Sequence, residues 1–204
     1  MHEEVLSEKQ KELLPLISSF SSNFGLIGGT AVALQIGHRR SIDFDLVTFS
    51  QLDATQVRGG IGDKYRIDAV LVDQTNQYTL VINGVKLTFM HYPFKFDLDV
   101  SYNGIIRMPD LLTFASIKAY ALGRRAKWKD YVDLYFIFQK HSFEEIIKRA
   151  KEIFGNEFNE KLFREELAYF DDIDYTEEVD YMGDFEVDNQ TVKERLSDIS
   201  LEKA

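Results

Sequence analysis

Apolar residues along the first half of the chain follow two different spacings. Helical spacing predicts helices over 7–20, 30–36 and 52–61. Short apolar or alternating runs predict strands over 24–27, 42–48, 65–72, 78–82 and 85–90. Asn83-Gly84 separates the last two strands and is a strong signal of a two-residue hairpin turn. Pro15 falls inside the first helix and predicts a kink or a later start.

From Pro109 onward the pattern is helical, with helices predicted over 109–122, 129–138 and 142–154. The last of these opens with Ser142 and Glu145 in the spacing of a capping box. The pattern therefore predicts an α+β fold, with a mixed α/β region over 1–108 and a helical region over 109–204. We expect the two regions to form one compact unit.

Composition adds the class of protein. Hydrophobic residues make up 45% and aromatic residues 13% of the chain, as in a globular protein with a core. There is no cysteine, which excludes disulfides and thiolate metal sites and is compatible with a reducing compartment. The N-terminus is charged and amphipathic, and no apolar run reaches the roughly 20 residues of a membrane span. We expect a cytoplasmic protein without membrane contact.

The net charge of −10 is unevenly distributed, because residues 1–150 carry +1 and residues 151–204 carry −11. The first 150 residues are therefore compatible with a phosphate-bearing ligand. Segment 171–188 holds nine acidic residues, no basic residue and several aromatic residues. It is either a solvated loop that packs a few aromatic rings onto the body, or an electrostatic mimic of nucleic acid that covers a basic site.

Two carboxylates stand out on the strand over 42–48. Asp43 and Asp45 share one face, so Ile42, Phe44 and Leu46 are expected to point into the core. Like charges this close repel unless a cation lies between them. Mg²⁺ (or Mn²⁺) suits this position, because it takes oxygen ligands and is completed by water and substrate phosphates.

A glycine turn precedes this strand. Gly28-Gly29 before a helix permits close backbone approach, the helix N-terminus attracts phosphate, and Thr30 adds a hydroxyl. Each feature has a plain alternative, namely an ordinary turn for the glycines and a polar strand face for the carboxylates. The combination, with 13 residues between Gly29 and Asp43, favours a triphosphate that runs from the glycines to a metal ion.

The two segments resemble a known motif. Gly-Gly-Thr-Ala-Val-Ala-Leu at 28–34 and His-Arg-Arg-Ser-Ile-Asp-Phe-Asp-Leu at 38–46 look like the first motif of AbiEii-type nucleotidyltransferases. This family belongs to the DNA polymerase β-like superfamily and includes toxins of toxin–antitoxin and phage abortive-infection systems. The resemblance continues at Asp110-Leu111, Lys118, Arg125 and Lys-Asp-Tyr-Val-Asp-Leu at 129–134, and covers residues 7 to 140.

The resemblance implies a polymerase β-like nucleotidyltransferase core with a C-terminal helical region. It implies a metal-dependent enzyme that moves NMP from an NTP to an acceptor such as RNA or protein, and a toxin with a cognate antitoxin. The implied catalytic residues are Asp43, Asp45 and Asp130, of which Asp43 and Asp45 hold Mg²⁺ or Mn²⁺. The implied nucleotide-binding residues are Gly28, Gly29, Thr30, Arg40, Ser41 and Lys118.

Several of these residues have structural alternatives. Asp133 lies one turn from Asp130, and Lys129 with Asp133 has the spacing of an ordinary surface ion pair. The basic cluster His38-Arg39-Arg40 either holds phosphates or an RNA, or is a solvated loop in which Arg40 screens Asp43. The aromatic residues Trp128 and Tyr131, beside Arg124, Arg125 and Lys127, either stack on nucleic acid or pack between helices.

One departure from the superfamily concerns a third carboxylate on a later strand. Thr88 occupies the position that would hold it, and the other candidates are Asp68, Asp97 and Asp99. Three rival functions follow. The same site could transfer the γ-phosphoryl group, as a kinase does; it could bind nucleotide without catalysis; or the fold could be a plain scaffold.

Overall fold

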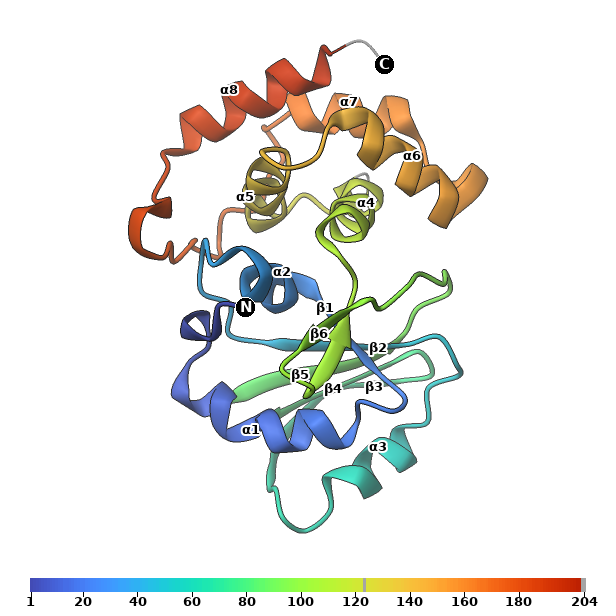
Figure 1. Cartoon of the computed structure of the whole chain (residues 1–204). Helices are drawn as coiled ribbons and strands as arrows, with labels where there is room; N and C mark the ends of the chain where they lie inside the picture. The colour runs from blue at the N-terminus through green and yellow to red at the C-terminus, as the bar shows by residue number, and fades with distance from the viewer. Residues whose placement is uncertain (123, 203–204) are drawn as a thin grey trace. The chain divides into compact units, whose positions relative to one another are not determined.

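The computed structural model describes residues 1–122 and 124–202, and divides into two compact units. The first unit is Met1–Asp110 and the second is Leu111–Ala204. The first is a mixed α/β unit and the second is helical (Figure 1). The predicted α+β fold class is therefore confirmed.

The first unit is built on a five-stranded sheet in the order β1-β2-β5-β4-β3. Its strands are β1 (Gly25–Ile27), β2 (Phe44–Thr48), β3 (Ile67–Gln74), β4 (Gln77–Ile82) and β5 (Val85–His91). β2 and β5 are parallel, and the other neighbours are antiparallel. A separate pair consists of β6 (Val100–Tyr102) and β7 (Ile106–Met108).

Local turn chemistry explains the hairpin between β4 and β5. Asn83 and Gly84 have φ angles of 53° and 74°, the left-handed region that such a tight turn requires. The predicted hairpin is confirmed. Strand β2 differs from the prediction, because it begins at Phe44 and Ile42 is 66% exposed. The expectation that Ile42 points into the core is wrong, since this residue belongs to the loop that leads into β2.

Helices cover both faces of this sheet. They are α1 (Glu8–Ser19), α2 (Gly28–Ile36) and α3 (Ala54–Ile61), preceded by a short 3₁₀ helix, η1 (Glu3–Val5). Figure 1 shows α2 on one side of the sheet and α1 with α3 on the other. Phe20, at the end of α1, packs edge-on against Phe89 of β5 at 4.9 Å between ring centroids. α1 begins at Glu8 and continues through Pro15, so no later start occurs.

The second unit consists of helices. They are α4 (Leu111–Leu122), α5 (Trp128–Ile137), α6 (Phe143–Phe154), α7 (Glu160–Ala168) and α8 (Asn189–Ser200), with 3₁₀ turns η2 (Gly155–Glu157) and η3 (Gly183–Phe185). The predicted capping box of Ser142 and Glu145 is confirmed at the start of α6. Helices α7 and α8 were not predicted. Their signals are the caps Asn159 and Asp188, each followed by apolar residues at helical spacing.

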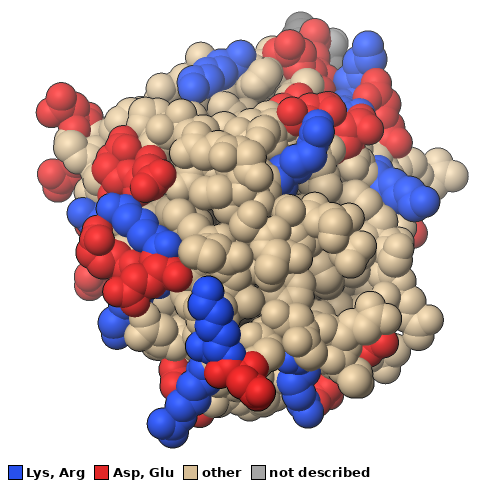
Figure 2. All heavy atoms as spheres, turned by 60° about the horizontal axis from the view of Figure 1, so that its bottom comes forward, with Lys and Arg blue, Asp and Glu red and all other residues tan. Residues whose placement is uncertain are grey.

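Charged side chains of both signs are interspersed on the face that Figure 2 shows. A nucleic-acid backbone on this face would therefore meet repulsive as well as attractive charges. Among the residues that the structure describes, no helix is long and apolar enough to cross a membrane.

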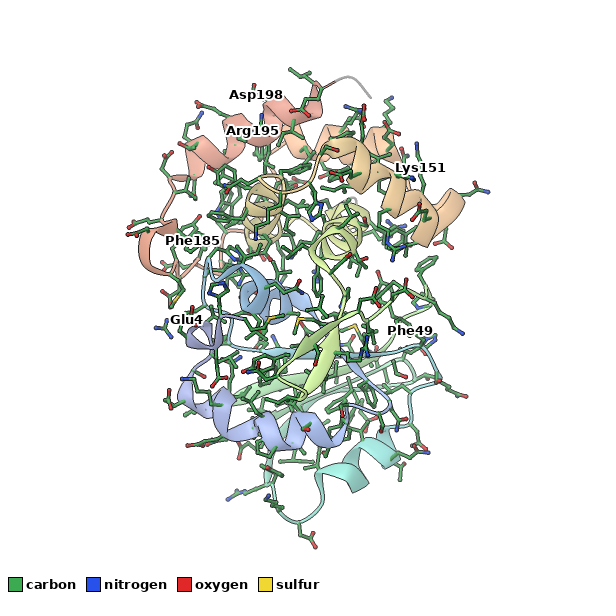
Figure 3. All side chains as sticks on the ribbon, in the orientation of Figure 1. Glu4, Phe49, Lys151, Phe185, Arg195 and Asp198 are labelled. Atoms are coloured by element: carbon green, nitrogen blue, oxygen red, sulfur yellow. The ribbon has the colours of Figure 1, made fainter. Side chains whose placement is uncertain are left out.

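The acidic segment 171–188 packs against its own unit. Tyr175 lies 5.3 Å from the Trp128 ring, and Phe185, labelled in Figure 3, lies 5.6 Å from the Phe136 ring. Glu177 forms ion pairs with Lys127 at 2.7 Å and with Lys129 at 3.3 Å. These contacts favour the first alternative, a solvated segment that packs aromatic rings onto the body.

Candidate functional site

The turn from β1 into α2 forms one wall of the candidate site. Gly28 has φ of +78°, and a Cβ on it would overlap the carboxylate of Asp45. A Cβ on Gly29 would overlap the guanidinium of Arg39. The N-cap residue of α2 is Ile27, which has no side-chain acceptor to cap the helix. The left-handed backbone and the nearby carboxylate therefore favour glycine at position 28, Gly29 leaves room for the Arg39 guanidinium, and Ile27 supplies no side-chain cap to the first N–H groups of α2.

The two carboxylates lie at the start of β2. Asp45 is the second residue of the strand and half-buried, and Asp43 directly precedes the strand. Phe44 and Leu46 are fully buried, which leaves the carboxylates on the opposite face. The Oδ2 atom of Asp43 lies 2.6 Å from Nζ of Lys86, a residue of β5. In this structure an ammonium group thus offsets the repulsion between the two carboxylates, and the sequence reasoning had not identified it.

The strand register settles what stands beside Asp45. Residues 45 and 88 are direct partners in the parallel pair of β2 and β5, so Thr88 is the neighbour of Asp45. Thr88 is 5% exposed, and its hydroxyl lies 3.5 Å from that of Thr79. A buried hydroxyl therefore stands beside Asp45, at the position where the resemblance predicts a third carboxylate.

The other candidates for a third carboxylate do not join this pair. Asp68 lies on β3, which is separated from β5 by β4, and accepts a hydrogen bond from the Gly84 N–H group at 3.3 Å. Asp97 and Asp99 are exposed in the segment between β5 and β6. Within residues 1–122 and 124–202, no group of three or more His, Cys, Asp or Glu side chains could hold a metal ion.

Two hydroxyls fasten the loop before β2 to the first turn of α2. The hydroxyl of Thr30 lies within hydrogen-bond distance of the Asp43 carbonyl and, at 2.9 Å, of the Ser41 hydroxyl. Thr30 is 2% exposed. These contacts give Thr30 and Ser41 a structural task, namely to hold Asp43 close to the glycine turn.

The basic cluster divides into buried and exposed members. His38 and Arg39 are buried, whereas Arg40 is exposed. Arg39 donates a hydrogen bond from Nη1 to the Arg40 carbonyl at 3.0 Å, and its guanidinium lies against Gly29. The interpretation as a solvated loop is therefore wrong for His38 and Arg39. Arg39 brings a positive charge to the glycine turn.

The second unit contains a buried ion cluster. Nζ of Lys118 on α4 lies 2.6 Å from Asp130 and 2.7 Å from Asp133, both on α5. Arg125 lies 3.3 Å from the second oxygen of Asp130. Burial works to raise the pKa of Asp130, but the positive charges of Lys118 and Arg125 outweigh it and hold this pKa below its ordinary value.

This cluster decides how Asp133 is paired and adds it to the predicted residues Lys118 and Asp130. Asp133 is fully buried and pairs with Lys118, so the suggested surface pair with Lys129 is wrong. Lys129 pairs with Glu177 instead. Lys118 and Asp130 are thus brought together within the second unit, and Asp133 joins them.

Of the two alternatives for Trp128, the structure favours packing between helices over stacking on nucleic acid. Trp128 is 3% exposed, and its ring lies 6.0 Å from that of Tyr131. Its Nε1 group donates a hydrogen bond to Asn189, the first residue of α8, at 3.0 Å. The tryptophan therefore joins α5 to α8, and its ring is not displayed for stacking on nucleic acid.

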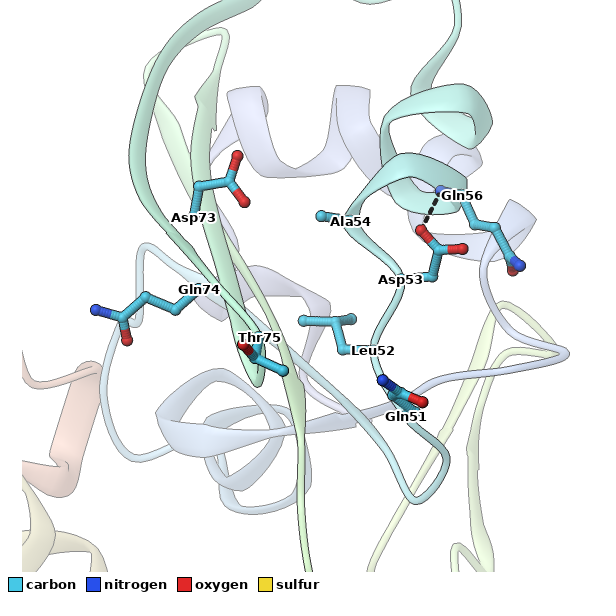
Figure 4. A pocket seen from close by; sticks show the side chains of 8 residues that line it. All are labelled: Gln51, Leu52, Asp53, Ala54, Gln56, Asp73, Gln74 and Thr75. Carbon is cyan, nitrogen blue, oxygen red and sulfur yellow. Dashed lines mark hydrogen bonds between the residues drawn. The ribbon is translucent and has the colours of Figure 1, made fainter.

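A large hollow of the first unit lies away from the carboxylates. It has a volume of about 640 Å³ and is lined by Gln51, Leu52, Asp53, Ala54, Gln56, Asp73, Gln74 and Thr75 (Figure 4). These residues follow the C-terminal end of β2 in the chain or lie at the end of β3 and in the turn after it, whereas Asp43 and Asp45 lie at the beginning of β2. The hollow and the candidate site are therefore different places on the molecule.

Comparison with known proteins identifies the fold. No protein-family profile matches the chain. The protein aq_aa25 of Aquifex aeolicus, itself uncharacterized, is 30% identical over 176 residues, which cover 82% of this chain and 84% of that protein.

Three solved structures share the architecture. A candidate nucleotidyltransferase from H. pylori has a TM-score of 0.57 and 17% identity, over 95% of this chain and 94% of its own. JHP933 from Helicobacter pylori has a TM-score of 0.56 and 16% identity, over 96% and 91% of the two chains. MenT4, a nucleotidyltransferase toxin of Mycobacterium tuberculosis H37Rv, has a TM-score of 0.60 and 10% identity, over 95% and 82%. The fold is that of the polymerase β-like nucleotidyltransferases.

Proposed function

This chain belongs to the family of the Aquifex aeolicus protein aq_aa25, and from its fold and its site we propose that it is a metal-dependent nucleotidyltransferase. It moves NMP from an NTP to an acceptor such as RNA or protein. The observation that carries the proposal is the contact between the Asp45 carboxylate and Gly28. It places the carboxylate pair beside an N-terminus of α2 that Ile27 leaves without a side-chain cap.

The residues present fit a magnesium or manganese ion. Asp43 and Asp45 supply hard carboxylate oxygens from one face at the start of β2. Mg²⁺ commonly takes one or two protein carboxylates and completes its shell with water and substrate phosphates. When bound, such an ion neutralises phosphate charge and polarises the α-phosphoryl group.

The chain's own residues divide the remaining tasks. The N–H groups at Gly28 and Gly29 bind the phosphates, and Asp43 and Asp45 orient the metal–nucleotide complex. The acceptor oxygen forms a bond to the α-phosphorus. The bond from that phosphorus to the oxygen that bridges to the β-phosphate breaks, pyrophosphate leaves with the bonding electrons, and the acceptor proton passes to a base.

Lys118 and Asp130 remain predicted participants from the second unit. Lys118 is predicted to offset the charge of the triphosphate, and Asp130 to act as the base. A lowered pKa makes a carboxylate a weaker base. The contacts of Asp130 therefore argue that it holds the Lys118 ammonium in place.

The proposal includes a biological role as a toxin. MenT4 is a nucleotidyltransferase toxin that shares this fold, and the motifs of this chain resemble those of AbiEii-type toxins. We infer a cognate antitoxin as partner. A second candidate function is nucleotide binding without catalysis, and the observation in its favour is Thr88 in place of a third carboxylate.

Calorimetric titration tests the proposal without knowledge of the acceptor. Each of the four NTPs is titrated with and without Mg²⁺ into the wild type and into Asp43→Asn/Asp45→Asn. The matched control is Asp97→Asn/Asp99→Asn, because these carboxylates have the same spacing and are exposed outside the site. We expect Mg²⁺-dependent binding that the first variant loses and the control retains.

Equal NTP binding in the wild type and both variants would show that Asp43 and Asp45 do not form the nucleotide site. If binding follows the expectation, transfer from α-labelled and γ-labelled nucleotide to a bacterial extract separates the functions. Transfer of the α-label supports the nucleotidyltransferase, transfer of the γ-label supports a kinase-like enzyme, and transfer of neither label supports the binding module.

A further inference from the structure

Strand β5 presents two side chains to the carboxylate pair. In the parallel pairing with β2, Thr88 stands beside Asp45. Lys86 lies two residues earlier on β5 and therefore on the same face of the sheet. Its Nζ atom is 2.6 Å from Oδ2 of Asp43. The strand that would supply a third carboxylate thus supplies an ammonium and a hydroxyl instead.

The net charge of the site explains how an ammonium could stand in for a carboxylate and a metal ion. Two-metal sites of polymerases hold their ions a few ångströms apart and use them to clamp the reacting phosphate. Three carboxylates with two divalent ions carry a net charge of +1. Two carboxylates with one divalent ion and one ammonium carry the same net charge, so Lys86 can balance the site with one metal ion fewer.

The surroundings of Lys86 suit this task. Its side chain is 43% exposed and that of Asp43 is 32% exposed, so the pair lies where a nucleotide and an ion can reach it. A lysine side chain has four rotatable bonds and three donors, and is a common partner of phosphate. The same ammonium can therefore neutralise Asp43 before ligand binding and contact phosphate afterwards.

We propose that Lys86 is a resident cation that replaces the second metal ion, so that the site binds one divalent ion together with the nucleotide. The inference rests on the proposed function, since it assigns Lys86 to the same nucleotide site. It predicts opposite effects of removing the ammonium. Metal alone binds more tightly, because a competing positive charge has left Asp43, whereas the metal–nucleotide complex binds more weakly.

The experiment measures how many Mn²⁺ ions bind to each chain and with what Kd. Free Mn²⁺ is measured by electron paramagnetic resonance during titration into the wild type, Lys86→Met and Lys86→Arg, first alone and then with ATP, GTP, CTP or UTP. Lys64→Met is the matched control, because Lys64 is an exposed lysine of the same unit and gives the same change in net charge.

We expect one Mn²⁺ per wild-type chain. In Lys86→Met the Kd for Mn²⁺ alone should fall about fivefold, and the Kd for the Mn²⁺–nucleotide complex should rise about fivefold, the scale of one partly exposed ion pair. Lys86→Arg and Lys64→Met should stay near the wild type in both titrations. A merely structural lysine would shift both constants in one direction.

Other outcomes overturn the inference. Two Mn²⁺ ions per wild-type chain, unchanged constants in Lys86→Met, or a shift of both constants in one direction would each refute it. Asp43→Asn/Asp45→Asn separates this failure from that of the proposed function. If the wild type binds Mn²⁺ and this variant does not, the site stands and only the role of Lys86 is lost. If both bind alike, the proposed site itself is wrong, and the role of Lys86 is lost with it.

Discussion

A side chain at position 28 would meet the Asp45 carboxylate, and the backbone there has φ of +78°. Gly28→Ala should therefore lose about 1–2 kcal/mol of stability to the left-handed backbone. It should also displace the Asp45 carboxylate and abolish or strongly weaken Mn²⁺ binding. Urea unfolding measures the first effect, and Mn²⁺ titration of the folded protein measures the second.

Gly104→Ala provides the control for this prediction. Gly104 has φ of +73°, and a Cβ on it would have no heavy atom within 4 Å. This variant should lose a similar amount of stability while Mn²⁺ affinity stays unchanged. Undiminished Mn²⁺ binding in Gly28→Ala would show that Asp45 does not need its contact with the glycine turn.

Among single residues, those of the candidate site that local sequence patterns encode could be predicted. Asp43 and Asp45 follow from strand alternation, and Gly28 from its position before a helix. Lys86 could not be inferred in this way, because its contact with Asp43 depends on the register of two strands that are distant in sequence. The alternation also misplaced Ile42, since the strand starts later than the apolar run.

The buried ion pairs of Lys118 with Asp130 and Asp133 join helix α4 to helix α5. Lys118→Met would leave two carboxylates in a buried site without this ammonium. We expect a loss of about 3–5 kcal/mol in the free energy of unfolding, the usual effect of removing one partner of a buried ion pair. Urea unfolding followed by the fluorescence of Trp128, the one tryptophan of the chain, measures it.

Lys129→Met is the matched control, because Lys129 lies on α5 beside Asp130 but pairs with the half-exposed Glu177. Its loss should stay below about 1 kcal/mol. Equal and small losses in both variants would show that the buried cluster contributes little. Replacing both carboxylates in the Lys118→Met background should recover part of the lost stability, because no buried charge then lacks its partner.

For helices and turns, signals carried by neighbouring residues predicted the structure correctly. The turn Asn83-Gly84 fixed a hairpin, and the box of Ser142 and Glu145 fixed the start of α6. The ion cluster was beyond such signals, because Lys118 and Asp133 meet only when two helices pack. The i, i+4 spacing of Lys129 and Asp133 suggested a pair on one helix, but burial of Asp133 and the nearby Lys118 decided otherwise.

Across the whole chain, the acidic residues concentrate in the C-terminal part, and so do carboxyl groups of lowered pKa. Hydrogen bonds from neighbouring groups are the leading cause of the lowered pKa in Glu145, Glu160, Asp174, Glu177 and Asp188. In the buried Asp130, burial opposes the lowering and the charges of Lys118 and Arg125 produce it. Glu166 is the exception, since burial first and then Asp172 raise its pKa.

The sign of the pH dependence follows from these directions. A carboxyl group whose pKa is lower in the folded than in the unfolded state stabilises the fold above its unfolded pKa of about 4. That contribution disappears as the pH falls through the folded pKa. Glu166 acts in the opposite sense, because protonation relieves its unfavourable burial. Its effect is opposed by the six carboxyl groups of lowered pKa. The second unit should therefore lose stability on acidification.

We accordingly predict that the urea midpoint reported by Trp128 fluorescence begins to fall at about pH 5 and falls most steeply below the unfolded pKa of about 4, between the unfolded and folded pKa values. Asp130→Asn removes the one buried member of the group and should make this dependence shallower, in addition to lowering the midpoint at neutral pH. Glu144→Gln is a control for the loss of one carboxylate, because Glu144 is an exposed acid of α6 in the same unit. A midpoint that stays constant or rises toward pH 3 would mean that these carboxyl groups are not preferentially ionised in the folded protein.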